Sequence, residues 1–180
     1  MIKCLCRVVS SILLIGSAAN AEPLAVGAEL PDIKAVDQDS KEVSLADYRK
    51  SPFVLVYFYP KADTPGCTAQ ACSLRDAYSE LTNDGVTVFG VSTDSPAQQK
   101  SFQKTYRLQF DLLADEDGSV AKAFGVPLRG KFAARQAFLF EKGKLIWMDQ
   151  KASTKQQADD VKKVLANLGA DKEKPASDAG

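Results

Sequence analysis

One uninterrupted run of hydrophobic residues and a second, mostly apolar segment stand out against an otherwise mixed pattern. Residues 53–59 read Phe-Val-Leu-Val-Tyr-Phe-Tyr, and a second apolar run, rich in valine, covers residues 86–92. Runs of β-prone residues without polar alternation are typical of strands that are buried on both faces. We therefore predict two central strands in a sheet that is covered on either side.

Helical patterns predict the elements that cover this sheet. One extends over residues 67–82, between the two strands. A second begins at Ser95 and Pro96, an N-cap followed by proline at the first helical position, and continues to about residue 106. A third, over residues 154–168, has apolar residues on one face, which is typical of an amphipathic helix.

Shorter elements complete the pattern and indicate the fold class. Hairpins are predicted over residues 32–43 and 136–148, with a short strand at 110–113 and a short helix at 117–124. Two buried strands joined by a helix imply a right-handed parallel crossover, whereas the hairpins add antiparallel strands. The order of elements predicts an α/β protein with a thioredoxin-like fold, in which a mixed central sheet has helices on both faces.

The first 21 residues have the composition of a secretory signal peptide. Lys3 and Arg7 are basic, residues 8–16 are largely apolar, and Ala-Asn-Ala at 19–21 matches a cleavage site. The alternative is a membrane anchor, but this run is about half of the roughly 20 residues that span a bilayer. The sequence therefore predicts a cleaved signal, export to the bacterial periplasm and no membrane attachment of the mature protein.

Composition limits the chemistry that the chain can perform. The 180 residues include no histidine, and 23 basic and 23 acidic side chains give a formal net charge of zero. Catalysis by Ser-His-Asp or Cys-His groups and histidine-ligated metal sites are thereby excluded. Without a basic stripe, nucleic acid is not expected as a partner. We predict one catalytic domain over residues 22–170 and a flexible tail over residues 171–180.

Cysteine usage directs attention to the loop after the first central strand. Signal cleavage would remove Cys4 and Cys6 and leave Cys67 and Cys72. Two cysteines are too few for a cysteine-only zinc site or a disulfide-stapled scaffold. We therefore expect no metal and no cofactor. The proximity of the two cysteines must then have another explanation.

Cys67 is a candidate nucleophile because it falls in the first turn of the predicted helix. Unpaired amides and the helix dipole favour an anion there, and the thiolate is the reactive form of cysteine. Gly66 allows the backbone to approach a small ligand, and the hydroxyl of Thr64 can donate to a thiolate or to a peroxide oxygen. The alternative on local grounds is a buried, inert cysteine beside a Thr-Pro-Gly turn.

Cys72 follows Cys67 by five residues on the same predicted helix. On an ideal helix this spacing separates the two Cα atoms by roughly 8.7 Å, whereas a disulfide needs less than about 7 Å. If the two sulfurs bond, the first turns of the helix must unwind. A disulfide that breaks its own helix favours reversible redox pairing over a purely structural bond.

The segment around both cysteines resembles the active site of a known family. Residues 58–76 contain the Pro-x-x-x-Thr-x-x-Cys motif of peroxiredoxins. They also contain a second cysteine five residues later, as in many members of the bacterioferritin comigratory protein / peroxiredoxin Q group. Further similar segments at 90–95, 113–118 and from Arg135 onward extend the resemblance over residues 24–168.

The resemblance implies a thiol-specific peroxidase that reduces hydrogen peroxide and organic hydroperoxides. It implies that Cys67 forms a sulfenic acid, which Cys72 resolves as an intramolecular Cys67–Cys72 disulfide. It also implies that Pro60 shields the site, that Thr64 bonds the peroxide, and that Arg135 holds the thiolate and polarises the O–O bond. A thioredoxin-like dithiol protein would reduce the disulfide, and the family favours a monomer.

The sequence departs from the family pattern at two positions. Position 70 often carries glutamate in this family but is Gln70 here, and the threonine often found two residues after the arginine is Ala137.

The sequence leaves two alternative functions to be distinguished. A thiol–disulfide oxidoreductase on the same fold usually has Cys-x-x-Cys, which this sequence lacks. A redox sensor would be recognised by a partner that responds only to the oxidised protein.

Overall fold

The computed structural model describes residues 24–173, a range that contains nine strands and six helices. The strands are β1 (Lys34–Asp37), β2 (Glu42–Ser44), β3 (Phe53–Phe58), β4 (Val86–Ser92), β5 (Asp111–Ala114), β6 (Leu128–Arg129), β7 (Phe132–Ala133), β8 (Gln136–Glu141) and β9 (Lys144–Asp149). The helices are the 3-10 helix η1 (Leu45–Tyr48) and the α-helices α1 (Pro65–Asp76), α2 (Tyr78–Asn83), α3 (Pro96–Tyr106), α4 (Ser119–Ala123) and α5 (Gln157–Glu173).

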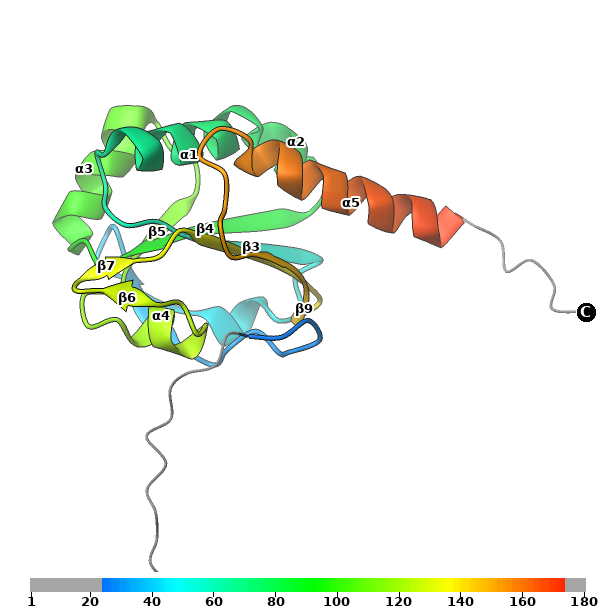
Figure 1. Ribbon diagram of the computed structural model, residues 1–180, viewed down its shortest axis with the longest axis horizontal. Coiled ribbons are helices and arrows are strands. Elements are labelled where there is room, and N and C mark those ends of the chain that lie inside the picture. Colours follow the sequence, from blue (N-terminus) through cyan, green and yellow to red (C-terminus); the bar gives the residue numbers. More distant parts are fainter. Residues whose placement is uncertain (1–23, 174–180) are drawn as a thin grey trace, which may run out of the picture.

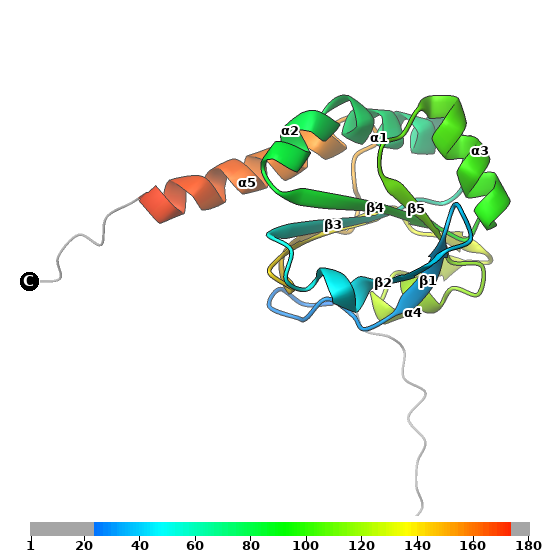
Figure 2. The same ribbon diagram turned by 180° about the vertical axis from the view of Figure 1, so that it is seen from behind.

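Seven of these strands form one mixed sheet in the order β2-β1-β5-β4-β3-β8-β9. Strands β3, β4 and β5 are parallel, and the other neighbours are antiparallel. Figures 1 and 2 show α1, α2, α3 and α5 over one face of the sheet and α4 over the other. The prediction of an α/β protein with a mixed sheet and helices on both faces is confirmed.

The sheet separates two hydrophobic cores, and β3 contributes to both. Leu55 and Tyr57 pack in the core beneath α1, α2 and α3, whereas Val56 and Phe58 pack in the core on the side of η1 and α4. Successive residues of a strand point to opposite faces, and all four side chains are fully buried. This two-sided burial explains why residues 53–59 show no polar alternation.

Helix α3 begins where its local sequence signals place it. The Ser95 hydroxyl accepts from the Gln98 amide, and the Gln98 side chain accepts from the Ser95 amide at 3.0 Å, which forms a capping box. Pro96 occupies the first helical position, where its missing N–H costs no hydrogen bond. The predicted helix over residues 95–106 is therefore confirmed.

Three features of the structure differ from the prediction. The helix expected over residues 67–82 is divided into α1 and α2 at Ala77, whose φ of −96° and ψ of 5° depart from helical values. The β6–β7 hairpin was not predicted, because strands of two residues carry no periodic pattern. Helix α5 continues to Glu173, three residues beyond the expected domain boundary, and the rest of the expected tail lies outside the described residues.

The expected signal peptide also lies outside the described residues. Within residues 24–173, no helix is both long and apolar enough to cross a membrane.

Candidate active site

The loop between β3 and α1 places Cys67 at the carboxyl edge of the parallel strands. Thr64 is the N-cap residue of α1, and Cys67 is the third residue of the helix. The Cys67 side chain is 1% exposed and belongs to the core beneath α1. The predicted position in a first helical turn is therefore correct, and the amides of that turn favour negative charge on the sulfur.

Arg135 reaches Cys67 because of the register between β3 and β8. Phe58 pairs with Gln136 across these antiparallel strands, so the residue that precedes β8 lies beside the start of the β3–α1 loop. The Arg135 Nη2 atom donates a hydrogen bond of 3.3 Å to Cys67 Sγ. A guanidinium is a permanent cation, so this hydrogen bond places a fixed positive charge directly beside the sulfur.

Gly66 has a packing role at this contact. A Cβ atom at position 66 would lie 3.3 Å from Arg135 Nη2 and 3.4 Å from Thr154 Cγ2. The first of these separations is tighter than ordinary van der Waals contact. The glycine predicted to admit a ligand thus also leaves room for the guanidinium beside the sulfur.

Two buried glutamine side chains hold Arg135 in place. Gln70 Oε1 accepts a hydrogen bond from Arg135 Nη1, and Gln70 Nε2 donates to Gln157 Oε1 at 2.8 Å. Both glutamine residues are completely buried. A chain of hydrogen bonds therefore extends from the first residue of α5, through α1, to the guanidinium and the sulfur.

Thr64 and Pro60 lie in the same loop, but among the described residues no hydrogen bond joins either of them to the sulfur. The Thr64 hydroxyl donates to the Lys61 carbonyl oxygen at 2.9 Å, so it closes the loop. Pro60 is half-buried and lines a groove that also includes Arg135. The buried Asp94 carboxylate anchors the loop by accepting from the Ala62 amide at 2.7 Å.

Cys72 lies on the same uninterrupted helix as Cys67. Its side chain is half-buried, and both cysteines are free thiols. Because α1 is continuous from Pro65 to Asp76, the helical separation between the two cysteines applies as predicted. A bond between their sulfurs would require the helix to change.

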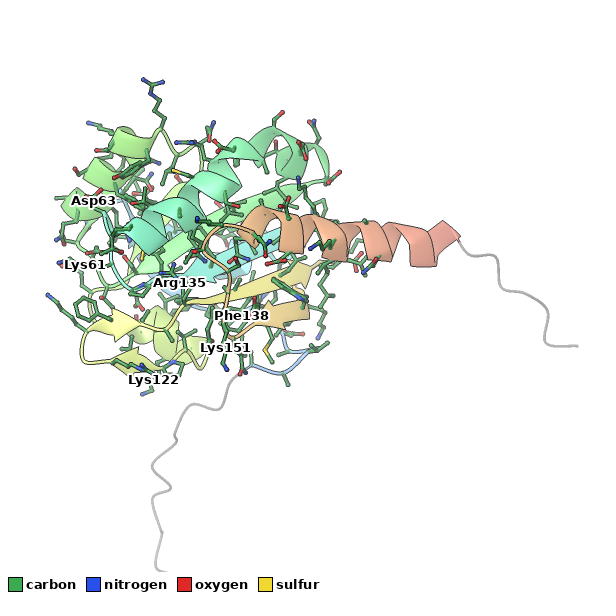
Figure 3. All side chains as sticks on the ribbon, turned by 45° about the horizontal axis from the view of Figure 1, so that its top comes forward. Lys61, Asp63, Lys122, Arg135, Phe138 and Lys151 are labelled. Atoms are coloured by element: carbon green, nitrogen blue, oxygen red, sulfur yellow. The ribbon has the colours of Figure 1, made fainter. Side chains whose placement is uncertain are left out.

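A groove with a volume of about 460 Å³ opens beside Arg135. Its lining residues are Pro60, Arg129, Phe132, Ala133, Ala134, Arg135, Gln150 and Lys151. Figure 3 shows Arg135 between Lys61, on the β3–α1 loop, and Lys151, which follows β9. Arg135 thus belongs both to the groove and to the hydrogen-bonded contact with the sulfur.

Two further residues at this site were missed by the sequence analysis. Gln157 is one, because a polar residue at the start of a surface helix gives no signal that it is buried. Tyr57 is the other. Its hydroxyl is buried without a hydrogen-bond partner among the described residues, and burial raises its pKa well above the ordinary value, with smaller contributions from Tyr59, Cys67 and Cys72. The phenol is therefore neutral.

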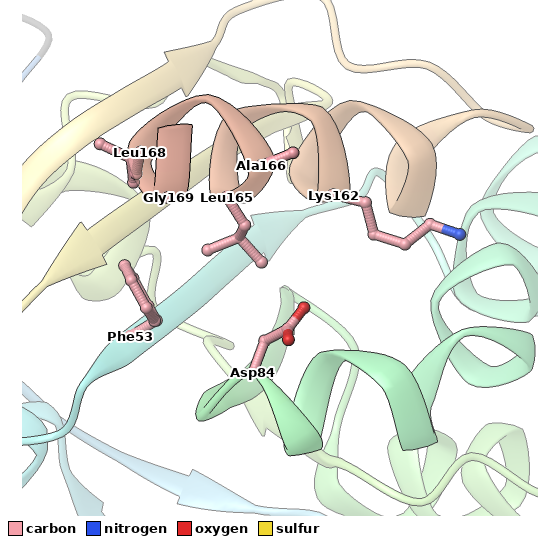
Figure 4. Close-up of a pocket in the computed structure, with 7 residues that line it drawn as sticks. All are labelled: Phe53, Asp84, Lys162, Leu165, Ala166, Leu168 and Gly169. Atoms are coloured by element: carbon pink, nitrogen blue, oxygen red, sulfur yellow. The ribbon is translucent and has the colours of Figure 1, made fainter. Parts of the chain in front are cut away.

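A second hollow lies at the opposite end of β3. It has a volume of about 370 Å³ and is formed by Phe53, Asp84 and one face of α5 (Figure 4). Phe53, which lines this hollow, is the first residue of β3, and the loop that carries Cys67 follows the last residue, Phe58. The hollow is therefore not part of the cysteine site. Among residues 24–173, no group of three or more histidine, cysteine, aspartate or glutamate side chains is arranged to hold a metal ion.

Comparison with known proteins gives one consistent family. Residues 26–148 match the AhpC/TSA family. A putative peroxiredoxin bcp of Haemophilus influenzae is 49% identical over 113 residues, which cover 63% of this chain and 72% of that protein. The crystal structure of peroxidoxin BcpB from Mycobacterium tuberculosis aligns with a TM-score of 0.71 and 33% identity, covering 81% of this chain and 96% of that one.

Plant relatives are similar over a smaller share of their own length. A chloroplastic peroxiredoxin Q of Populus jackii is 39% identical over 142 residues, or 77% of this chain. The matched part is 66% of that protein and 54% of a second plant peroxiredoxin Q. The chain thus spans between about half and two thirds of the length of these relatives.

These comparisons correct the prediction of a periplasmic location. The bacterial Bcp relatives are cytosolic peroxiredoxins, and the expected signal falls within residues 1–23, outside the described part of the chain. The prediction was wrong because it depended on two basic residues and a short apolar run, a compositional pattern without any contribution from the fold.

Proposed function

Because the chain belongs to the AhpC/TSA family, within which its relatives are Bcp and peroxiredoxin Q proteins, we propose that it is a thiol-specific peroxidase. The substrates are hydrogen peroxide and organic hydroperoxides, and the catalytic residue is Cys67. The observation that carries this proposal is the hydrogen bond from Arg135 to the buried sulfur of Cys67. This contact places a fixed positive charge beside the sulfur, and the same arginine lines an open groove.

In the first step, the Cys67 thiolate attacks one peroxide oxygen. The S–O bond forms as the O–O bond breaks, and the departing oxygen takes a proton and leaves as water or an alcohol. Cys67 is thereby oxidised to a sulfenic acid. Arg135 stabilises the thiolate and then the negative charge that develops on the leaving oxygen. In this scheme Thr64 turns its hydroxyl from Lys61 to the peroxide, Pro60 screens the sulfenic acid from solvent, and Gly66 leaves the space that the substrate enters.

In the second step, the Cys72 thiolate attacks the sulfenic sulfur and releases water. The product is a Cys67–Cys72 disulfide, and the helical separation of the two residues means that the first turns of α1 open to form it. Both steps use residues of a single helix, which supports a monomeric catalyst. The catalytic domain in this proposal spans residues 22–170, and α5 extends it to Glu173.

The third step is reduction of the disulfide by a thioredoxin-like dithiol protein. One thiolate of the reductant attacks the disulfide, forms a mixed disulfide and releases one cysteine of this chain as a thiolate. The second thiol of the reductant then attacks the mixed disulfide and releases the other cysteine. The reductant leaves oxidised, and Cys67 and Cys72 return to free thiols. No cofactor is required, since every electron comes from a thiol.

A test of the proposal is to mix the reduced protein with one equivalent of hydrogen peroxide and to map both cysteines. We expect Cys67 and Cys72 to lose their thiols together, because one peroxide consumes two electrons. The Cys72→Ser variant should react at a similar rate but lose only the Cys67 thiol and accumulate a sulfenic acid that dimedone traps. A wild-type reaction no faster than that of a free thiol would contradict the proposed function.

Gln157 has the geometry of a positioning residue, and its replacement provides a second prediction. In Gln157→Ala, Gln70 loses the acceptor that fixes its amide, so Arg135 is held less firmly against Cys67. A lost hydrogen bond of about 1 kcal/mol corresponds to a roughly fivefold slower reaction with peroxide. In a double variant with Arg135→Met, Gln157→Ala should add no further loss of rate, which is the measurement that separates positioning from stability.

Ser73→Ala is the matched control for this variant. It removes the other hydrogen bond between α1 and α5, in which the Ala158 amide donates to Ser73 Oγ at 3.2 Å, without affecting Arg135. The control should lower the melting temperature but leave the rate of the reaction with peroxide unchanged. Equal rate losses in both variants would mean that Gln157 only stabilises the fold.

A further inference from the structure

Exposed apolar side chains gather on the β6–β7 hairpin, next to the cysteine site. Among the described residues, the exposed large hydrophobic side chains are Val26, Leu128 and Phe132. Two of them belong to this hairpin, with Leu128 41% and Phe132 39% exposed. Exposed apolar side chains with a polar rim are typical of interaction surfaces.

Cations without carboxylate partners surround these apolar residues. Arg129 and Lys131 are on the hairpin, Lys151 lies across the groove, and Figure 3 shows Lys122 and Lys61 on the same side of the molecule. None of the five has an ion pair among the described residues, and all are exposed. Elsewhere Lys34, Lys100, Lys144 and Lys162 each pair with a carboxylate.

The hairpin is held firmly in position. The Thr93 hydroxyl, after the carboxyl end of β4, donates to the Lys131 carbonyl oxygen. The Ala134 amide donates to the Pro127 carbonyl oxygen at 2.9 Å and closes the base of the hairpin. A surface that is already ordered loses less entropy when a partner binds. The hairpin thus presents its side chains rigidly at the edge of the sheet where Cys67 lies.

We propose that Leu128, Arg129, Lys131, Phe132 and Lys151, here called the hairpin surface, form the docking site for the protein reductant. This inference rests on the proposed function. The partner is a dithiol protein with carboxylates around its reactive cysteine. The five unpaired cations steer such a partner, and the two apolar side chains form the centre of the contact.

The positions of the two apolar side chains favour a protein, and not a small anionic hydroperoxide, as the partner that binds the hairpin surface. Phe132 lines the groove beside Arg135, whereas Leu128 lines a separate hollow with Lys122 on the other side of the hairpin. A small molecule would fill one hollow and leave the other apolar side chain exposed. A protein that straddles the hairpin covers both. Its thiolate then attacks the Cys67–Cys72 disulfide in the exchange described above.

The test reverses two charges on the hairpin surface. The double variant Arg129→Glu with Lys151→Glu is compared with Lys50→Glu with Lys104→Glu, which has the same charge change on exposed lysines elsewhere that likewise have no ion pair among the described residues. Each oxidised protein is mixed with reduced thioredoxin or with dithiothreitol, and recovery of the Cys67 and Cys72 thiols is followed at low and high salt. Dithiothreitol is small and neutral, so it does not need the surface.

We expect the hairpin variant to react with thioredoxin about tenfold more slowly at low salt, a difference that high salt removes. Its reaction with dithiothreitol, its oxidation by hydrogen peroxide and the control variant should change less than about twofold. Phe132→Ser should likewise slow only the thioredoxin reaction.

Three results would overturn the inference. The first is an unchanged thioredoxin rate in the hairpin variant. The second is a loss confined to oxidation by an anionic organic hydroperoxide, which would assign the groove to substrate. The third is an equal loss of the thioredoxin rate in the control variant, which would show that the net charge of the protein, and not the hairpin surface, determines the rate. A failure of peroxide reduction with dithiothreitol as the reductant would instead refute the proposed function.

Discussion

Replacing Cys67 with serine is expected to abolish peroxide reduction, with a loss of at least about a thousandfold. Serine has nearly the same size, so the buried position in α1 is kept. Its hydroxyl does not ionise at neutral pH, and Arg135 would face a neutral oxygen in place of a thiolate. The measurement is peroxide consumption with dithiothreitol as reductant, with the melting temperature as a check on folding.

Cys72→Ser is the matched control, because it makes the same substitution on the same helix. This variant should consume one equivalent of peroxide before it stops or slows, whereas Cys67→Ser should consume none. Turnover that survives in Cys67→Ser and disappears in Cys72→Ser would exchange the roles of the two cysteines. Turnover that survives in both would place the chemistry elsewhere.

Replacing Arg135 with methionine should slow oxidation of Cys67 by roughly a hundredfold, which is the usual effect of removing one donor that stabilises developing negative charge. Methionine fills much of the same space but cannot donate to Cys67 Sγ or to Gln70. Arg135→Lys should recover little of this loss, because an ammonium group lacks the two-pronged geometry that meets both partners. Stopped-flow oxidation of the reduced protein measures the rate directly.

Arg129→Met is the control for this prediction. Arg129 lines the same groove, but the structure records no hydrogen bond between it and Cys67. Its replacement removes one positive charge from the groove and should leave the oxidation rate within about twofold. Equal losses in Arg129→Met and Arg135→Met would show that the general positive potential of the groove, and not the contact with sulfur, accelerates the reaction.

The parts of the fold that the sequence predicts well are those governed by local chemistry. Helix α3 carries its own capping box and first-turn proline, and β4 is an apolar run that coincides with the observed strand. The break at Ala77 has no proline or glycine to announce it. The β6–β7 hairpin is too short for periodicity and depends on contacts such as Thr93 with Lys131.

The same distinction applies to the candidate site. Cys67 can be predicted as a nucleophile from the residues next to it, because the loop and the start of the helix are encoded within a few residues. Arg135 is brought to it by strand pairing across more than 70 residues, and only the family resemblance pointed to it. Gln157 depends on how α5 docks against α1. Neither position has a local pattern that distinguishes it from an ordinary surface residue.

The continuity of α1 has a consequence for the energetics of recycling. The helix is complete when both thiols are free, whereas the proposed disulfide requires its first turns to open. Opening the helix on oxidation costs free energy, which is recovered on reduction. This cost destabilises the oxidised protein relative to the reduced one, and it therefore raises the reduction potential of the disulfide. For a two-electron couple, 1.4 kcal/mol corresponds to about 30 mV. The helix that presents Cys67 to peroxide thus also makes the oxidised protein a stronger oxidant toward the dithiol that restores it.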